Sequence, residues 1–246
     1  MRLTRHPENP ILEPIPGHAW ESRNLCNCGV ITDDGPYVLI YRAQGGDSDI
    51  SRLGFAESAD GVHFMRLPEP VFVPETPDEI KGVEDPRLTL LDGRVQMLYT
   101  AWSPEAIPWR CQIARASTTD FEKWERQEIV ISGPDNKDAA LFPDKVAGRY
   151  GAFHRIPSLI WIARSDDLTT WGDEREIMAP RPGLFDAWKL GAGGPPIATD
   201  LGWLVIYHGV DHDRVYRLGV ALLDRDDPSR VINWPEKPVL SPEEPW

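Results

Sequence analysis

The chain has 246 residues, 41% of them hydrophobic, and a formal net charge of -13 at pH 7. This length and apolar content are enough for one large domain or two small ones. An acidic surface of this kind repels nucleic acid and anionic lipid, so neither is expected as a partner.

The first residues, MRLTRHPENPILEP, contain no apolar segment of the kind that signal peptides carry. No apolar run approaches the roughly 18 residues that a membrane-spanning helix needs. The three cysteines form no Cys-x-x-Cys pair, and the six histidines are scattered along the chain. We therefore expect a cytoplasmic protein without a disulfide framework, a metal site or a membrane segment.

Four short apolar runs recur along the chain and are predicted to be strands. They are YVLIYRAQG from position 37, VQMLYTAWS from 95, YGAFHRI from 150 and WLVIYHGVD from 203. Each run contains an aromatic or histidine ring at a matching position, and these rings belong to Tyr41, Tyr99, His154 and Tyr207. The separations, obtained by subtracting successive numbers, are 58, 55 and 53 residues.

A second strand-like segment follows each run: RLGFAESADGVHF, CQIARASTTDFEKW, LIWIARSDDLTTW and RLGVALLD. Three of these share an alanine, a serine, an aspartate or glycine and then an aromatic residue. No long stretch shows the 3.6-residue periodicity of a helix. A period of 50 to 58 residues with several strands per unit is typical of β-propeller blades, so we expect one all-β propeller domain over residues 1–246. A β-sandwich with accidental internal similarity is the alternative.

Polar residues gather at comparable points of the repeat, where propellers bind ligands near their axis. One group is acidic and comprises Glu84, Asp85 and Asp138, and a carboxylic acid of this kind can protonate a glycosidic oxygen. The other group is basic, comprises Arg155, Lys189 and His208, and suits a small oxyanion such as phosphate. An isolated loop charge is usually solvated or ion-paired, but the recurrence favours a binding site.

Four tryptophans in expected loops, Trp20, Trp102, Trp109 and Trp188, could stack on sugar rings, although packing in a core is the commoner fate of this residue. The chain has no Gly-x-Ser-x-Gly, P-loop or His-Glu-x-x-His motif. The glycine-rich stretch GAGGPP at 191–196 lacks the lysine of a P-loop and indicates a close backbone approach instead.

Four longer motifs carry a resemblance to a known family. They are GVEDPRL, NKDAALFPDKVAGRYGAFHRI, KLGAGGPPIATDLGWLVIYHGVD and YRLGVALLDRDDPSRV, in this order along the chain. Together they resemble glycoside hydrolase family 130, the β-mannoside phosphorylases and related β-mannosidases, and the similarity extends from position 9 to the end. The resemblance implies a five-bladed β-propeller that releases mannose 1-phosphate from a β-mannoside with inversion. A small oligosaccharide and inorganic phosphate are then the substrates, with no other cofactor.

The resemblance also implies roles for individual residues. The catalytic acid would be Asp85, which in the phosphorylases is thought to pass its proton through a sugar hydroxyl. The sugar would be held by Asn27, Arg42, Arg87 and Asp138. Glu84, the neighbour of the acid, is also expected to bind the substrate. Phosphate would be held by Arg155, Lys189, His208 and Tyr216.

The sequence departs from the family pattern at two places. Asp135 stands where phosphorylases tend to carry an arginine, and a carboxylate there would oppose a bound anion. The chain also ends at EEPW, where another strand should begin, so the last blade is expected to be truncated. Either the sequence is a fragment, or the propeller is left open or is closed by another chain, and an open edge would favour pairing in a homo-oligomer. These departures leave a β-mannoside hydrolase and a non-catalytic sugar-binding propeller as alternatives.

At the acid itself, Pro86 predicts an extended backbone for Asp85.

Overall fold

The computed structural model describes residues 2–32, 35–46 and 48–243. The chain divides into two compact units, which are treated separately below. The N-terminal unit is His6–Pro134, and the C-terminal unit combines Met1–Arg5 with Asp135–Trp246. Nearly all regular structure in the described residues is β-strand, apart from one short 3-10 turn at Pro77–Glu79. No helix in this part of the chain is long and apolar enough to cross a membrane.

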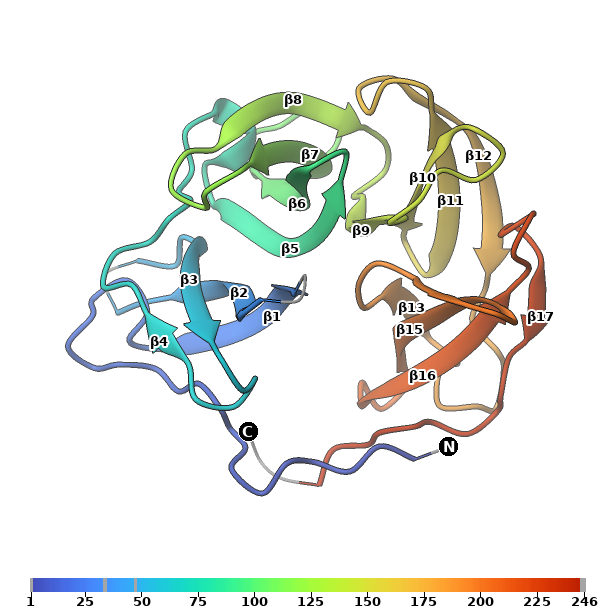
Figure 1. The fold of residues 1–246 in the computed structure, drawn as a ribbon, viewed down its shortest axis with the longest axis horizontal. Coiled ribbons are helices and arrows are strands. Elements are labelled where there is room, and N and C mark those ends of the chain that lie inside the picture. The colour runs from blue at the N-terminus through green and yellow to red at the C-terminus, as the bar shows by residue number, and fades with distance from the viewer. Residues whose placement is uncertain (1, 33–34, 47, 244–246) are drawn as a thin grey trace. The chain divides into compact units, whose positions relative to one another are not determined.

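The N-terminal unit contains two antiparallel sheets of four strands, each in simple sequential order (Figure 1). The first sheet has the order β1-β2-β3-β4, with bounds β1 (Asn24–Ile31), β2 (Tyr37–Gln44), β3 (Arg52–Ser58) and β4 (Met65–Arg66). The second has the order β5-β6-β7-β8, with bounds β5 (Gly82–Leu91), β6 (Arg94–Trp102), β7 (Cys111–Thr118) and β8 (Glu125–Ile131).

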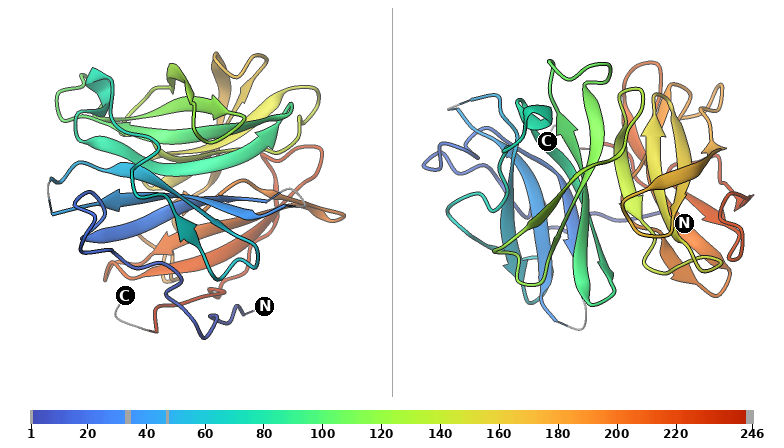
Figure 2. Two further views of the ribbon diagram at one scale, coloured as in Figure 1. Left: turned by 60° about the vertical axis from the view of Figure 1, so that its left-hand side comes forward. Right: turned by 90° about the horizontal axis from the view of Figure 1, so that it is seen from above.

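The C-terminal unit repeats this arrangement. One sheet has the order β12-β11-β10-β9, with bounds β9 (Lys137–Leu141), β10 (Tyr150–Ile156), β11 (Leu159–Ser165) and β12 (Trp171–Met178). The other has the order β13-β15-β16-β17, with bounds β13 (Lys189–Ala192), β15 (Gly202–Val210), β16 (Tyr216–Leu223) and β17 (Val231–Asn233), and β14 (Ile197–Thr199) also pairs with β15. The strands twist strongly across each sheet (Figure 2), as antiparallel sheets do.

The all-β expectation is confirmed, and sequential four-stranded sheets of this kind are the building block of β-propellers. The expectation of five blades is wrong for the described residues, which form four sheets. In the C-terminal unit, the described residues beyond β17 return to the existing sheet. Leu240 bridges to Leu218 of β16, and the Leu3 amide donates to the Val239 carbonyl at 2.8 Å. The single domain over residues 1–246 stays a prediction.

The four rings that defined the repeat occupy equivalent buried positions. In three sheets a tyrosine hydroxyl donates to a buried carboxylate, at 2.8 Å from Tyr41, 2.6 Å from Tyr99 and 2.8 Å from Tyr207. An arginine of the same sheet region neutralises each carboxylate. The resulting Tyr–carboxylate–Arg triads are Tyr41–Glu21–Arg66, Tyr99–Glu79–Arg126 and Tyr207–Asp186–Arg181. The three carboxylates are at most 1% exposed, so each depends on its partners to remain charged.

The remaining sheet has His154 at the tyrosine position. The Asn136 side-chain amide donates to Nδ1 of His154 at 2.9 Å, and both side chains are buried. Nε2 of the same ring is buried without a hydrogen-bond partner. Burial lowers the pKa of His154 to about 4, so the imidazole is neutral at pH 7.

The second repeated element is a tight turn between the third and fourth strands of three sheets. In the first, Ser58 Oγ accepts from the Gly61 amide at 3.0 Å, and Asp60 Oδ1 accepts from the Val62 amide at 2.9 Å. Thr118 with Asp120 and Ser165 with Asp167 make the same bonds. The shared sequence pattern is therefore a turn motif built on a serine or threonine and an aspartate, in which short side chains replace backbone acceptors.

Each unit has its own apolar core. In the C-terminal unit the core contains Phe142, Phe153 and Trp203, while the N-terminal unit packs Phe72 against Tyr99. The buried Trp20 lies against Tyr41 and donates Nε1 to the Pro68 carbonyl at 2.8 Å, so this tryptophan packs in the core, which is the commoner fate, and is no platform for a sugar.

Candidate active site

Three of the residues that the sequence predicts for the site stand at the same structural irregularity. In three of the sheets the strand that comes first in the sequence contains a β-bulge, where two of its residues oppose one residue of the next strand. The first residue of each bulge has a positive φ, which is 48° at Asn27, 52° at Asp85 and 54° at Asp138. The opposing residues are the repeat rings Tyr41, Tyr99 and His154.

The backbone of Asp85 differs from the sequence-based expectation. Pro86 favours an extended conformation for the preceding residue, but Asp85 adopts the left-handed region instead. The bulge requires this conformation, and aspartate and asparagine are the non-glycine residues that tolerate it best. Sheet pairing therefore overrides the local preference, and all three bulges place a short polar side chain at this point.

The acidic cluster in the N-terminal unit is built around Asp85, which is 4% exposed. The Asn27 side-chain amide donates to Asp85 Oδ1, and Arg42 Nη1 lies 3.6 Å from the same oxygen. The neighbouring β1 strand approaches closely because Gly29 has no side chain, since a Cβ there would lie 2.8 Å from the Pro86 carbonyl oxygen. The acid is thus held between an amide and a guanidinium.

Glu84 shares Arg42 with its neighbour Asp85 and has a serine as a further partner. Arg42 Nη2 donates to Glu84 Oε1 at 2.5 Å, and Ser51 Oγ donates to the same oxygen at 3.1 Å. Arg42 therefore joins both carboxylates and offsets part of their charge. Ser51 was missed by sequence reasoning, because a serine outside the repeated strands carries no pattern that marks it.

Arg87 lies on β5 directly after the bulge at Asp85 and Pro86. Its Nη1 donates to the Pro86 carbonyl at 3.0 Å, and the side chain is 6% exposed. Its buried Nε has no hydrogen-bond partner. A buried N–H without an acceptor is costly, which suits a position where a ligand oxygen supplies the missing acceptor.

The basic cluster lies in the C-terminal unit and surrounds Asp138, which is 5% exposed. Arg155 Nε lies 3.0 Å and His208 Nε2 3.7 Å from Asp138 Oδ2. The His208 ring stands 5.5 Å from the Tyr216 ring, and Lys189 Nζ lies 5.0 Å from the same tyrosine ring. All five residues that the sequence predicts in this unit therefore form one continuous group, in which two permanent cations outweigh one carboxylate.

Gly191 explains how the basic cluster fits together. It pairs with His208 across β13 and β15, and a Cβ at this position would lie 2.3 Å from both Asp138 Oδ2 and His208 Cε1. No real Cβ contact is that short, so only glycine leaves space for the carboxylate and the imidazole. This confirms the close backbone approach that the GAGGPP stretch predicts.

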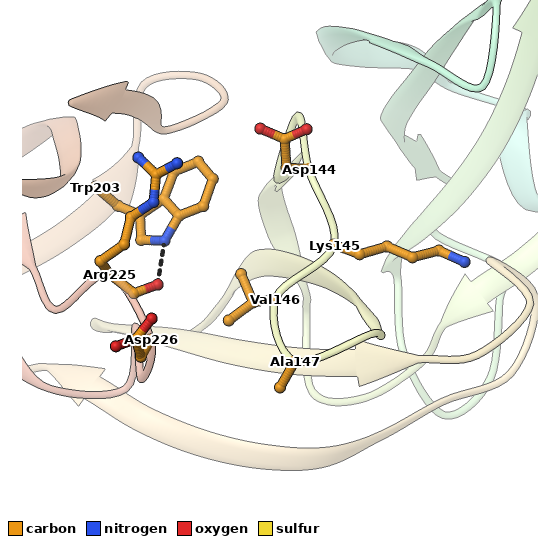
Figure 3. A pocket seen from close by; sticks show the side chains of 7 residues that line it. All are labelled: Asp144, Lys145, Val146, Ala147, Trp203, Arg225 and Asp226. Carbon is orange, nitrogen blue, oxygen red and sulfur yellow. Dashed lines mark hydrogen bonds between the residues drawn. The ribbon is translucent and has the colours of Figure 1, made fainter. Parts of the chain in front are cut away.

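A cavity of about 430 Å³ lies elsewhere in the C-terminal unit (Figure 3). It lies beside Trp203, whose Nε1 donates to the Arg225 carbonyl at 3.0 Å. Trp203 precedes His208 by five residues on β15, which separates the two by roughly 17 Å along the strand. None of the predicted site residues lines this cavity, and no group of three or more metal-ligand side chains occurs in the described residues.

A cluster of carboxylates held by amide and guanidinium groups, and a cluster of cations able to hold an oxyanion, are the groups that glycoside chemistry needs. Together with the sheet architecture they define the chain as a carbohydrate-active enzyme. Within that class it belongs to glycoside hydrolase family 130, because the family model, described as beta-1,4-mannooligosaccharide phosphorylase, matches residues 2–246.

Individual relatives agree with this assignment. A 1,2-beta-oligomannan phosphorylase from Thermoanaerobacter sp. (strain X514) is 43% identical over 252 residues, covering 100% of this chain and 84% of its own length. A beta-1,2-mannobiose phosphorylase of the same organism is also 43% identical, over 258 residues, with the same coverage. The solved structure of the Listeria innocua beta-1,2-mannobiose phosphorylase in complex with beta-1,2-mannobiose is similar, with a TM-score of 0.84 at 28% identity, covering 96% of this chain and 83% of that one.

Proposed function

We propose that this enzyme is an inverting phosphorylase of β-1,2-linked mannosides, which releases mannose 1-phosphate. The observation that carries the proposal is the basic cluster of Arg155, Lys189, His208 and Tyr216 around Asp138. Charge-assisted hydrogen bonds to an oxyanion are roughly twice as strong as neutral ones, so this group suits inorganic phosphate. The 43% identity to two phosphorylases acting on β-1,2-linked mannans or mannobiose supports both the reaction and the linkage.

In this reaction a phosphate oxygen attacks the anomeric carbon while the bond to the glycosidic oxygen breaks. The departing oxygen receives a proton that originates on Asp85 and, by the family resemblance, passes through a sugar hydroxyl. Asn27 and Arg42 fix the Asp85 carboxyl, and Arg87 offers an N–H to the sugar. Asp138 orients Arg155 and His208 for the phosphate.

Hydrolysis is the weaker candidate. Asp135, the residue that motivates it, is exposed on the loop before β9, where water screens its charge. The relatives at 43% identity are phosphorylases. A non-catalytic sugar-binding protein is not favoured either, because Asp85 and its supporting contacts are all present. Cytoplasmic location and homo-oligomerisation stay predictions from the sequence.

The test is phosphorolysis of β-1,2-mannobiose by purified protein, followed by proton NMR. We expect α-mannose 1-phosphate to appear only when phosphate is present, since inversion converts the β-linkage to an α-phosphate. Asp85→Asn should reduce the rate by at least a thousandfold with unchanged folding, whereas Asp49→Asn, at an exposed ion pair with Arg23, should match the wild type. Equal turnover with and without phosphate, giving free mannose, would overturn the proposal in favour of hydrolysis.

A further inference from the structure

An exposed aromatic side chain borders the basic cluster and has no role in the reaction described so far. Trp188 directly precedes Lys189 and is 39% exposed, and it is the only tryptophan among the large exposed hydrophobic side chains of the described residues. Its backbone amide donates to the Val210 carbonyl at 2.9 Å, which fixes it to the end of β15. Trp188 is therefore held on the sheet while its indole remains accessible.

The indole is continuous with the basic cluster. Lys189 Nζ lies 5.1 Å from the centroid of the Trp188 ring and 5.0 Å from that of the Tyr216 ring. Arg214 is a second cation beside the indole, and its Cζ lies 5.5 Å from the Trp188 ring. The side chains thus form a row in the order Arg214, Trp188, Lys189, Tyr216 and His208. We call the first two of them, Arg214 and Trp188, the Trp188 ledge.

The turn between β15 and β16 sets the position of Arg214. Asp211 organises this turn, because its carbonyl accepts from the Arg214 amide at 3.0 Å and its Oδ1 accepts from the Val215 amide at 3.0 Å. Its Oδ2 accepts from Arg217 Nη1 at 2.6 Å. Arg214 itself has a φ of 64°, a conformation that costs energy for an arginine and persists only where the surroundings impose it.

The chemistry of the ledge matches a sugar. An accessible indole can pack against the C–H face of a pyranose, and a guanidinium beside it can donate several hydrogen bonds to hydroxyls. A single exposed hydrophobic side chain is ordinary, but this one lies beside the lysine of the basic cluster and beside an arginine whose backbone is fixed by the turn. Pockets for small polar ligands combine these two features, an apolar surface and a few placed donors.

We propose that the Trp188 ledge is a binding subsite for a further mannosyl unit, beyond the two joined by the bond that is broken. The inference rests on the proposed function and deepens it, because a subsite of this kind makes the enzyme favour oligosaccharides over the disaccharide. The two relatives at 43% identity are named for one substrate of each length, an oligomannan and a mannobiose. From the Trp188 ledge we expect this enzyme to prefer the longer oligomannan substrates over mannobiose.

The experiment compares kcat/KM for β-1,2-mannobiose and β-1,2-mannotetraose at saturating phosphate. The wild type should prefer the tetraose, and Trp188→Ala should lower the tetraose-to-biose ratio about tenfold, while Trp188→Phe, which keeps a ring, should lower it less. Arg214→Ala should lower the ratio about threefold. Leu201→Ala, at an exposed residue in the β14–β15 turn of the same unit, should leave the ratio at the wild-type value.

A binding measurement separates recognition from catalysis. Calorimetric titration of Asp85→Asn with mannotetraose should give tighter binding than the same titration of the Asp85→Asn, Trp188→Ala double variant. A ratio unaffected by Trp188→Ala would overturn the subsite. So would an equal fall for both substrates with a raised KM for phosphate, since Trp188 would then only position Lys189. Absence of mannose 1-phosphate from wild-type protein with either substrate would instead refute the proposed function.

Discussion

At the scale of single residues, Asn27, Asp85 and Asp138 share one backbone device. Each is the first residue of a β-bulge, and each has a φ near 50°. A bulge interrupts the regular alternation of side chains along a strand and changes the direction of one of them. These three side chains are therefore redirected at the same point of the repeat. The short side chains of asparagine and aspartate make this conformation tolerable.

The tightest packing in the basic cluster is at Gly191, and it gives a sharp prediction. Gly191→Ala places a methyl group where Asp138 Oδ2 and the His208 ring now lie, so both side chains must move. We expect kcat/KM to fall at least tenfold and the KM for phosphate to rise. Gly194→Ala is the matched control, because a Cβ there meets nothing within 4 Å. Similar phosphate kinetics in the two variants would show that the cluster tolerates the displacement.

His154 makes stability depend on pH. Its pKa is lowered by burial from 6.5 to about 4, so the unfolded chain takes up a proton at a pH where the folded chain does not. The contribution of neutral His154 to the free energy of unfolding is fully present above pH 6.5. It is lost as the pH falls towards 4, and the whole loss is on the order of 3 kcal/mol.

The measurement is urea unfolding between pH 7 and pH 4.5. The free energy of unfolding should fall less steeply with pH in His154→Gln than in the wild type. His212→Gln, at an exposed histidine, should keep the wild-type slope. Parallel curves for all three proteins would mean that His154 already binds its proton in the folded state.

At the scale of structural elements, the buried carboxylates of the triads hold the sheets together internally. Arg126 Nη1 lies 3.1 Å from Glu79 Oε1, Tyr99 donates to the same oxygen at 2.6 Å, and the Glu75 amide donates to Oε2 at 2.8 Å. Removing the cation leaves a carboxylate in the interior with hydrogen bonds but no countercharge. That arrangement is unfavourable because the local dielectric constant is low.

We therefore expect Arg126→Met to lower the free energy of unfolding by about 3–5 kcal/mol. Arg94→Met provides the comparison, because the Arg94–Glu125 pair is exposed and should contribute less than about 1 kcal/mol. Chemical denaturation of both variants measures the two values. Comparable losses would indicate that Glu79 is protonated or hydrated once its arginine is gone.

How far the sequence predicted these elements depends on spacing. The repeat rings stand at nearly regular intervals and a turn built on a serine or threonine and an aspartate recurs in three sheets, so both the strands and the sheet class followed from the pattern. The triad carboxylates could also have been predicted from the sequence, since they precede their tyrosines by a nearly constant 20, 20 and 21 residues. The corresponding position before His154 is Pro134, which is why that sheet uses an uncharged contact with Asn136. The triad arginines stand at no constant separation in sequence from their tyrosines, so only the structure identifies them.

The site was predicted residue by residue from the family resemblance, and the structure brings its members together in two clusters. What the sequence could not supply was the bulge at Asp85, because local rules favour an extended residue before proline. It also could not supply the contacts of Ser51 or Gly191, which depend on strands distant in the chain. Pairing between strands decides such positions, and a single sequence contains no direct record of it.

At the scale of the whole molecule, the chain's first residues belong to the unit that its last half forms. The Leu3 amide bonds to Val239, Arg5 Nη2 donates to the Ser241 carbonyl at 2.9 Å, and Arg2 pairs with Glu243 at the surface. These contacts join opposite ends of the sequence without adding a strand. Their main effect should be on stability, since none involves a residue of the basic cluster.

Deleting residues 2–5 should remove two hydrogen bonds to backbone carbonyls within the C-terminal unit, worth about 1 kcal/mol each, together with the exposed Arg2–Glu243 ion pair, which contributes little. We expect thermal unfolding to occur a few degrees lower, at about 2–4 °C per kcal/mol for a domain of this size. Leu3→Ala keeps the backbone bond and should shift the transition less. An unchanged transition temperature for the deletion would show that the N-terminal segment contributes nothing to the folded state.

The triads have an evolutionary consequence. Each one lies within the segment that forms a single sheet, as from Glu79 to Arg126 in the second. A duplicated or deleted sheet therefore carries its own countercharges with it and leaves no buried carboxylate unpaired elsewhere. Genes encoding such repeats can gain or lose one unit in a single recombination event without an electrostatic penalty in the neighbouring repeats.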